Sequence, residues 1–277
     1  MRLKLNFFNV LKITSVLVII LLLTTAAFTF NIGSRIYRYF YGVKAGVTLE
    51  GIPMEKMLPA EVQAEVEKMA KAINKAPVNA RFDKETMEII PEENGLTVDI
   101  TATVEAVMSA QPREEVKLKV IVLEPEITAE IFRSIDKKIA EFSTSGGGSQ
   151  GRTDNLYVAA KYMNGTILAP GDVFSFNKAT GPRTIERGYS MAPVVGGMGI
   201  GGGVCQVATT IYNAAMLAGM EIVERHPHSI RVYYVPPGRD ATVTNYIDFK
   251  FRNSTDKFIQ IRSGAGGGYV WVQIWSQ

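Results

Sequence analysis

The chain has 277 residues, of which 47% are hydrophobic and 21% are charged. This length and composition exclude a wholly disordered protein and allow one large or two ordinary domains with buried cores. Lysine and arginine number 30 against 27 for aspartate and glutamate, and the resulting formal charge of +3 is too balanced for a dedicated nucleic-acid binder.

The sulfur and imidazole content limits the chemistry further, because the chain has one cysteine, Cys205, and two histidines, His226 and His228. A single thiol excludes an intramolecular disulfide framework. Three Cys and His side chains are too few for a structural zinc cluster, which takes four ligands. We therefore expect no metal and no cofactor, and the thiol is either a packing residue or a nucleophile.

The N-terminal segment predicts a transmembrane anchor. Residues 13–34 carry no charge, and as a helix they would extend about 33 Å, enough for the hydrocarbon core of a membrane. The charges that precede this run are all basic: Arg2, Lys4 and Lys12. The positive-inside rule then predicts a single-pass protein of the cell membrane, with residues 1–40 as cytoplasmic tail and anchor and an extracytoplasmic body. A cleaved signal peptide and a buried soluble helix are the alternatives.

Residues 41–127 predict a small α+β domain. Pro59–Ile73 has apolar residues at helical spacing, and Thr101–Met108 predicts a second helix between short candidate strands. The carboxylates of this segment are scattered as on a solvated surface, and they form no catalytic constellation. The segment is therefore interpreted as a binding or spacer domain.

A connection and a second domain follow. Thr128–Phe142 predicts a connecting helix and Ser143–Gly151 a Gly/Ser linker, so residues 128–151 separate the domains. Residues 152–277 predict a mainly β domain with two or three helices. Its expected strands are Val173–Phe176, Arg231–Val235, Ala241–Val243, Tyr246–Arg252, Phe258–Ser263 and Tyr269–Trp275. The expected class of the whole chain is α+β.

A glycine run precedes the thiol. Six glycines lie between Gly196 and Gly203, followed by Cys205 and a helix-like run, Val207–Leu217. This pattern predicts that Cys205 lies at a helix N-terminus, where unpaired amides and the helix dipole favour a thiolate. The same amides are suited to hold the oxyanion that forms when a thiolate attacks a carbonyl.

A nucleophilic thiol needs a base, and only His226 and His228 offer imidazoles. Both would point to the same side of an extended segment, so their spacing does not choose between them. We favour His228, because it leads into the predicted strand Ile230–Val235. Asp240 is the first candidate to orient the imidazole, and Asp248 is the second.

Other interpretations of these residues remain open. Cys205 can be a small buried side chain, and the glycines can form a mobile flap or a close packing contact. Gly197-x-Gly199-x-x-Gly202 also fits a dinucleotide-binding fingerprint, but the surrounding sequence has no βαβ unit.

The second domain resembles the VanW family in motifs that follow one another over about residues 150 to 262. The matching motifs are Arg152-x-x-Asn155, Pro170-Gly-Asp-Val-Phe-Ser-Phe-Asn177, Gly201-Gly-Gly-Val-Cys-Gln206, His228-Ser229 and Gly238-Arg-Asp-Ala-Thr-Val243. The preceding segment more loosely resembles the peptidoglycan-binding module often found upstream of VanW domains.

The resemblance implies a cell-wall role, with peptidoglycan stem peptides as the partner. VanW-type domains have been proposed to act as cysteine-dependent L,D-transpeptidases, which suits Cys205 as nucleophile in 3-3 cross-linking through a thioester. We infer His228 as base and Asp240 as its orienting group. The groups expected to bind the stem or its oxyanion are Gly202, Gly203, Val204, Gln206 and Arg239.

Two further functions compete with this prediction. One is a non-catalytic peptidoglycan-binding or scaffold protein, in which Cys205 is packed and the glycine loop shapes a groove. The other is a glycopeptide-antibiotic binder linked to vancomycin resistance. The sequence predicts no oligomeric state.

Overall fold

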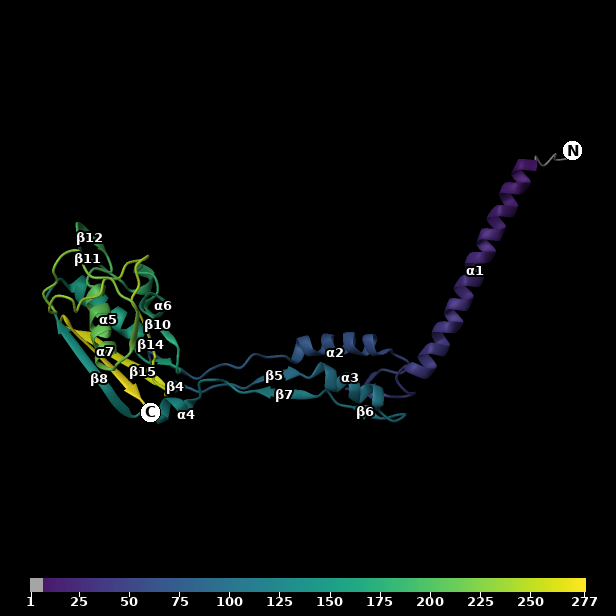
Figure 1. The fold of residues 1–277 in the computed structure, drawn as a ribbon, viewed down its shortest axis with the longest axis horizontal. Coiled ribbons are helices and arrows are strands. Elements are labelled where there is room, and N and C mark those ends of the chain that lie inside the picture. Colours follow the sequence, from purple (N-terminus) through teal and green to yellow (C-terminus); the bar gives the residue numbers. More distant parts are fainter. Residues whose placement is uncertain (1–6) are drawn as a thin grey trace. The chain divides into compact units, whose positions relative to one another are not determined.

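The computed structural model describes residues 7–277, with the side chains of residues 7–14, 23–24 and 26–31 left out of the description. The predicted tail charges Arg2 and Lys4 therefore lie outside the described residues. The predicted α+β class is confirmed, since helices and several small sheets alternate along the chain (Figure 1). The chain divides into two compact units, residues 1–77 with 94–124 and residues 78–93 with 125–277.

The first described helix, α1, covers Phe7–Tyr41 and includes the segment expected to cross the membrane. Among the residues whose placement is described, no helix combines the length and the hydropathy that a membrane span requires. Part of the predicted span lies among the residues whose side chains are not described.

After α1, the first unit contains two further helices and several short strands. Pro59 occupies the first turn of α2, and the Asp99 carboxylate accepts a hydrogen bond from Ala102 N at the start of α3. The predicted amphipathic helix is confirmed, with Val62 and Val66 fully buried. Besides α1, the elements of this unit are β1 (Thr48–Leu49), β2 (Ile52–Pro53), α2 (Pro59–Ile73), β5 (Gly95–Val98), α3 (Ile100–Ser109), β6 (Glu115–Val116) and β7 (Val120–Leu123).

The second unit is built on a four-stranded antiparallel sheet in the order β8-β16-β15-β9. Along β16, Val270, Val272 and Ile274 are fully buried and alternate with half-buried residues, so one face of the sheet carries the core. Helices α5 and α7 contact this sheet. The elements are β8 (Lys137–Ser145), α5 (Gln150–Met163), β9 (Thr166–Leu168), α7 (Val204–Leu217), β15 (Ile259–Gly266) and β16 (Tyr269–Ser276).

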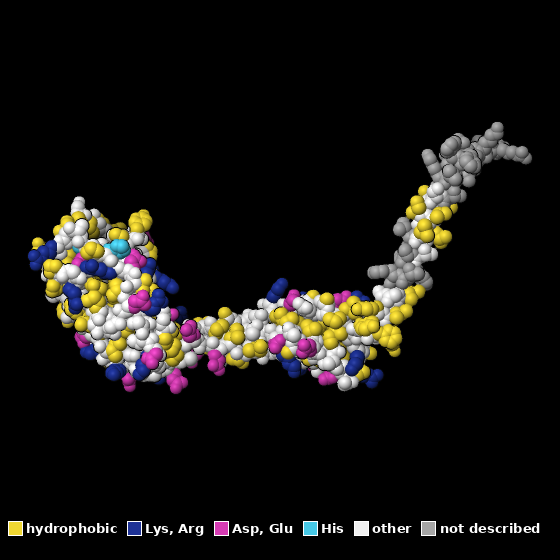
Figure 2. Space-filling view, in the orientation of Figure 1, with side chains coloured by type: hydrophobic (Ala, Val, Ile, Leu, Met, Phe, Trp, Pro, Cys, Tyr) yellow, Lys and Arg dark blue, Asp and Glu magenta, His cyan; other side chains and the backbone are white. Residues whose placement is uncertain are grey.

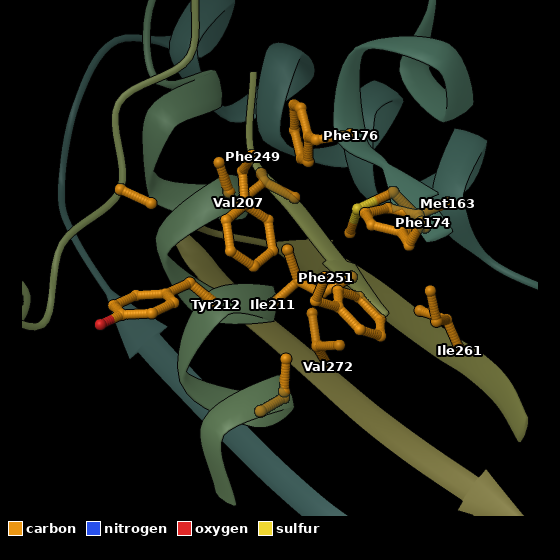
Figure 3. Packing of buried hydrophobic residues seen from close by; sticks show 14 of the residues in the cluster. Met163, Phe174, Phe176, Val207, Ile211, Tyr212, Phe249, Phe251, Ile261 and Val272 are labelled. Carbon is orange, nitrogen blue, oxygen red and sulfur yellow. The ribbon is translucent and has the colours of Figure 1, made fainter. Parts of the chain in front are cut away.

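A smaller sheet in the order β10-β14-β13 closes the core of this unit. Phe174, Phe249 and Phe251 meet here with ring centroids 5.2 to 6.1 Å apart, against Ile211 of α7 (Figure 3). The remaining elements are β3 (Arg81–Phe82), β4 (Ile89–Ile90), α4 (Ala129–Ser134), β10 (Val173–Ser175), α6 (Phe176–Thr180), a 3-10 turn (Ile185–Arg187), β11 (Met191–Val194), β12 (Gly197–Ile200), β13 (Glu221–Glu224) and β14 (Lys250–Arg252).

The predicted connection at residues 128–151 has a different structure. Helix α4 covers only Ala129–Ser134, and β8 extends into the expected linker as far as Ser145. Thr144 in this part of the strand is buried, and its hydroxyl is hydrogen-bonded to that of Thr210 at 2.8 Å. Ser149 then caps α5. The segment before it also differs, since residues 78–93, predicted within the 41–127 domain, belong to the second unit.

The expected strands of the second domain are only partly present. Those near Val173, Phe258 and Tyr269 are confirmed, whereas Arg231–Val235 and Ala241–Val243 are irregular and Tyr246–Arg252 shortens to β14. Their backbone groups bond to side chains and turns instead, as where Ala241 N donates to the Thr209 hydroxyl at 2.9 Å.

Candidate active site

The glycine run forms a hairpin that leads directly into α7. Strands β11 and β12 pair in antiparallel fashion, and Gly203 caps α7 with a φ of 102°, a conformation that favours glycine. The Asn155 amide donates to the Gly202 and Ser190 carbonyls, both at 3.0 Å. Asn155 therefore fixes the entry to α7, and Cys205 occupies the second position of this helix, as the sequence predicts.

The N-terminal end of α7 brings together Cys205, His228 and Asp240. Asp240 Oδ2 lies 2.7 Å from His228 Nδ1 and also accepts a hydrogen bond from His228 N at 2.6 Å. Because Nδ1 is held by the carboxylate, Nε2 is the nitrogen left to exchange a proton with the thiol. The Cys205 thiol, half-buried, donates to the Val243 carbonyl at 3.4 Å. This is the arrangement of nucleophile, base and orienting group that acyl transfer requires.

The electrostatics favour a charged pair. Burial raises the pKa of the Cys205 thiol, but hydrogen bonding to His228 and Val243 and the charge of Arg183 outweigh it, so the pKa is lowered overall. The pKa of His228 is raised, chiefly by its hydrogen bond with Cys205 and then by Asp240, against the opposing effect of burial. The two directions together favour a thiolate beside an imidazolium.

Arg225 completes the support of the carboxylate. Its Nη2 donates to Asp240 Oδ1 at 2.9 Å and its Nε to the Asp240 carbonyl at 2.7 Å. Burial raises the pKa of Asp240, but its hydrogen bonds with His228 and the charge of Arg225 outweigh burial. The pKa is therefore lowered overall, and Asp240 stays ionised. An ionised Asp240 holds the imidazole in one orientation.

The thiol opens into a cleft of about 900 Å³. One wall is the β11–β12 hairpin, and the other is the irregular chain around His228 and Val243. Figure 2 shows histidine side chains at the surface of the C-terminal unit, among hydrophobic and basic side chains. The lining includes Arg152, Arg183, Val194, Ile200, Gly201, Gly202, Gly203, Val204, Gln206, Ser229, Val232, Tyr234 and Thr242. A cleft of this size accommodates a short peptide.

Comparisons with known proteins fit this organisation. Residues 151–275 match the family described as "VanW like protein", and residues 28–117 match "Putative peptidoglycan binding domain". The Bacillus subtilis (strain 168) protein YoaR is 32% identical over 236 residues, which cover 79% of this chain and 78% of YoaR. The chain belongs to the VanW family.

A second relative carries the family's name. The Vancomycin B-type resistance protein VanW of Enterococcus faecalis (strain ATCC 700802 / V583) is 31% identical over 117 residues. That match covers 39% of this chain and 42% of the relative, so the chain spans less than half of it. No solved structure gave a significant match. The VanW match contains Cys205, His228 and Asp240.

Two of the alternatives left open by the sequence lie apart from this arrangement. The His226 side chain is 49% exposed and bonds Glu224 Oε1 at 3.2 Å. Asp248 accepts hydrogen bonds from Ser175 Oγ at 2.6 Å and Asn177 N at 2.8 Å, so its carboxylate orders the start of α6. Within the described chain, neither His226 nor Asp248 lines the cleft at Cys205.

Of the expected binding groups, Gly202, Gly203, Val204 and Gln206 line the cleft, whereas Arg239 does not, and the side chain of Gln206 is already bonded within the protein. Gln206 is fully buried; its Oε1 accepts from Arg152 Nη2 at 2.7 Å and its Nε2 donates to Thr144 Oγ1 at 3.1 Å. It therefore ties α7 to β8. Arg239 is not among the described lining residues, and its carbonyl accepts from Asn213.

Sequence reasoning missed two polar groups of the cleft. Arg183 donates to Asn177 Oδ1 at 2.6 Å and to the Thr244 carbonyl at 3.2 Å, and burial lowers its pKa. The buried Thr242 hydroxyl has no hydrogen-bond partner among the described residues. Thr242 could have been found from the sequence, because it lies in the family motif Gly238–Val243. Arg183 could not, because tertiary contacts alone bring its side chain near the thiol.

Metal-ligating side chains do not cluster in the described part of the chain. Among these residues, no group of three His, Cys, Asp or Glu side chains is arranged to hold a metal ion.

Proposed function

We propose that this VanW protein modifies peptidoglycan as a cysteine-dependent L,D-transpeptidase. The observation that carries the proposal is the cluster of Cys205, His228 and Asp240 at the base of a peptide-sized cleft. The match of residues 28–117 to a peptidoglycan-binding family supports the choice of polymer. The name of the Enterococcus faecalis relative refers to vancomycin resistance, which is also consistent with a cell-wall substrate.

In the proposed acylation, the Cys205 thiolate attacks the carbonyl carbon of the third residue of a stem tetrapeptide. The His228 imidazolium gives its proton to the departing amine, the peptide bond breaks, and D-alanine leaves. The product is a thioester on Cys205 and a neutral imidazole. Asp240 holds Nδ1 throughout, so that Nε2 remains directed to the reacting atoms.

In the proposed deacylation, an amine on a neighbouring stem attacks the thioester carbonyl. His228 takes the proton from this amine, a 3-3 peptide bond forms, and the thiolate leaves. If water attacks instead, the result is hydrolysis of the stem. The chemistry of the cluster allows both outcomes, and the acceptor decides between them.

The start of α7 is suited to stabilise the oxyanion in both steps. Val204 N and Gln206 N already donate to the Gly201 and Gly203 carbonyls, at 3.2 and 2.8 Å. The amide of Cys205 lies between them in the first turn, where the helix has no carbonyl to offer it. We therefore assign the oxyanion to the Cys205 amide rather than to those of Val204 and Gln206.

Polar groups farther along the cleft suit the ends of a stem peptide. The Arg183 guanidinium offers a positive charge near the thiol, suited to a carboxylate on the leaving D-alanine or on the stem. The free Thr242 hydroxyl can bond to the backbone of the peptide. Binding these groups would place the scissile carbonyl over Cys205.

The location of the reaction follows from the sequence of the first 40 residues. We propose that the charge-free run 13–34 anchors the protein in the cell membrane once, with a cytoplasmic N-terminus and an extracytoplasmic catalytic unit. Added protease should digest the body of the protein in intact protoplasts and leave an N-terminal tag protected. Protection of the body would contradict this orientation.

Mass spectrometry of the full chain incubated with tetrapeptide muropeptides tests the chemistry. We expect an acyl adduct on Cys205, release of D-alanine, and no adduct with Cys205→Ala or His228→Gln. His226→Gln is the matched control and should acylate normally, because that ring is exposed and bonded to Glu224. Normal cross-linking in cells by Cys205→Ala would refute the enzyme and favour the scaffold function.

A further inference from the structure

A row of aromatic side chains lies on the sheet face away from the core. Tyr269, Trp271 and Trp275 alternate along β16 with residues of the buried core and therefore point to the opposite face. Trp271 and Trp275 are the two tryptophans of the chain, about 13 Å apart along the strand. Since α5 and α7 contact the sheet on its core side, this row lies on the other side of the unit from Cys205.

Trp271 is held as a flat platform. It pairs with Gly264 of β15, and a Cβ at that glycine would lie 2.7 to 2.8 Å from three atoms of the indole. The ring therefore lies across the glycine backbone, in a position that only glycine permits. The Trp275 ring is covered by the Arg262 guanidinium at 4.1 Å, and its Nε1 donates to Gln273 Oε1.

A cavity of about 340 Å³ adjoins this platform. Its sides come from the sheet, from α4 and from the β3–β4 hairpin, all of which belong to the second unit. Phe82, Met87, Ile89 and Phe132 form its apolar part. The volume falls in the range of small-molecule sites.

The polar groups of this cavity are mainly donors without acceptors. Gln260 is 5% exposed, and its Oε1 accepts from Arg262 Nε at 2.7 Å, which leaves its Nε2 without a partner among the described residues. Asn164 Oδ1 accepts from Ser263 N, and its Nδ2 has only the Met87 sulfur, at 3.9 Å. A ligand for this site must therefore supply acceptors.

We propose that this cavity binds an N-acetylated amino sugar of a glycan strand. The flat face of a pyranose suits the Trp271 platform, because its C–H groups pack against an aromatic ring. The acetamido carbonyl offers the acceptor that Gln260 and Asn164 lack, and the acetamido methyl suits the apolar wall formed by Phe82 and Met87. Only the identification of the glycan as that of peptidoglycan rests on the proposed function.

Calorimetric titration of the full chain with soluble N-acetylglucosamine oligomers tests this site. We expect saturable binding and a change in tryptophan fluorescence, since both tryptophans lie on the binding face. Glucose oligomers of equal length, which lack the acetamido group, should bind at least about tenfold more weakly. Equal binding of both oligomers would overturn the assignment of the acetamido group.

Two variants locate the ligand. Trp271→Ala removes the platform and Gln260→Glu replaces the free donor by an acceptor with little change in shape; each should weaken binding at least about tenfold. Tyr157→Ala removes an exposed aromatic side chain of α5 and should bind normally. No binding by the unsubstituted chain, or undiminished binding by both cavity variants, would overturn the proposal.

A further comparison separates this site from the catalytic cleft. Cys205→Ala should keep its affinity for the oligomers, and Trp271→Ala should still form the acyl adduct with a soluble stem peptide. Loss of oligomer binding in Cys205→Ala would place the sugar in the cleft and refute the second site. Absence of the acyl adduct with intact oligomer binding would refute only the transpeptidase.

Discussion

Replacing Asp240 by Asn tests how the thiol is activated. Asp240 Oδ2 bonds the His228 ring at 2.7 Å and the His228 amide at 2.6 Å, and Asn replaces this charged acceptor by a neutral amide oxygen. A hydrogen bond to a charged group contributes about 1.5–3 kcal/mol. At about 1.36 kcal/mol per unit, its loss should lower the pKa of His228 and raise the pKa of Cys205 by about 1–2 units.

The direction of the expected shift follows from the pairing of the Cys205 thiolate with the His228 imidazolium. A thiol whose pKa lies below its ordinary range is reactive at lower pH, and losing the imidazolium moves the onset of reactivity to higher pH. Thiolate nucleophilicity rises with pKa and offsets nearly half of this effect. Below the shifted pKa, the alkylation rate should fall about 3-fold to 10-fold.

The measurement is the rate of iodoacetamide alkylation against pH, read by mass spectrometry on the one cysteine of the chain. His226→Asn is the control, because the exposed ring bonds Glu224 and should leave the profile unchanged. Superimposable profiles for the unsubstituted chain and Asp240→Asn would show that Asp240 does not act on the thiol through His228.

Three further substitutions test the support of the site. Gln206→Leu removes the bonds that Gln206 makes to Arg152 and Thr144 and should destabilise the fold by about 1–3 kcal/mol, seen as a lower melting temperature; an unchanged temperature contradicts this. Gly203→Ala forces a side chain to a φ of 102°, 2.8 Å from the Arg152 side chain, and should destabilise the fold by about 1–3 kcal/mol and slow alkylation of the thiol. Phe251→Ala empties the centre of the core and should lose about 3–5 kcal/mol in urea unfolding, whereas a loss below about 1 kcal/mol would refute its central packing.

The site was partly accessible from sequence because its signals are local. Glycines followed by an apolar run place Cys205 at a helix start whatever the rest of the fold does. With only two histidines in the chain, the choice of base was narrow. The reason given for preferring His228 was wrong, since Ile230–Val235 is irregular rather than a strand; the ring is held by Asp240 instead.

Features that depend on distant parts of the chain could not be predicted in this way. The small and polar residues of Ser143–Gly151 are typical of a linker. Thr144, however, belongs to β8 and is hydrogen-bonded to Thr210 and Gln206 of α7. Arg183 likewise reaches the thiol only because α6 and the irregular chain near Thr244 hold its guanidinium there. Such contacts follow from tertiary packing rather than from spacing.

The path of the chain between its two units has a consequence for dissecting the protein. The polypeptide leaves the first unit after Pro77, forms the β3–β4 hairpin of the second, and returns at Asn94 before leaving again after Glu124. A truncation that starts at residue 128 would therefore strip Phe82 and Ile89 from the cluster around Phe132, exposing apolar side chains. A fragment of the second unit prepared for crystallisation would keep these contacts only if residues 78–93 were supplied with it.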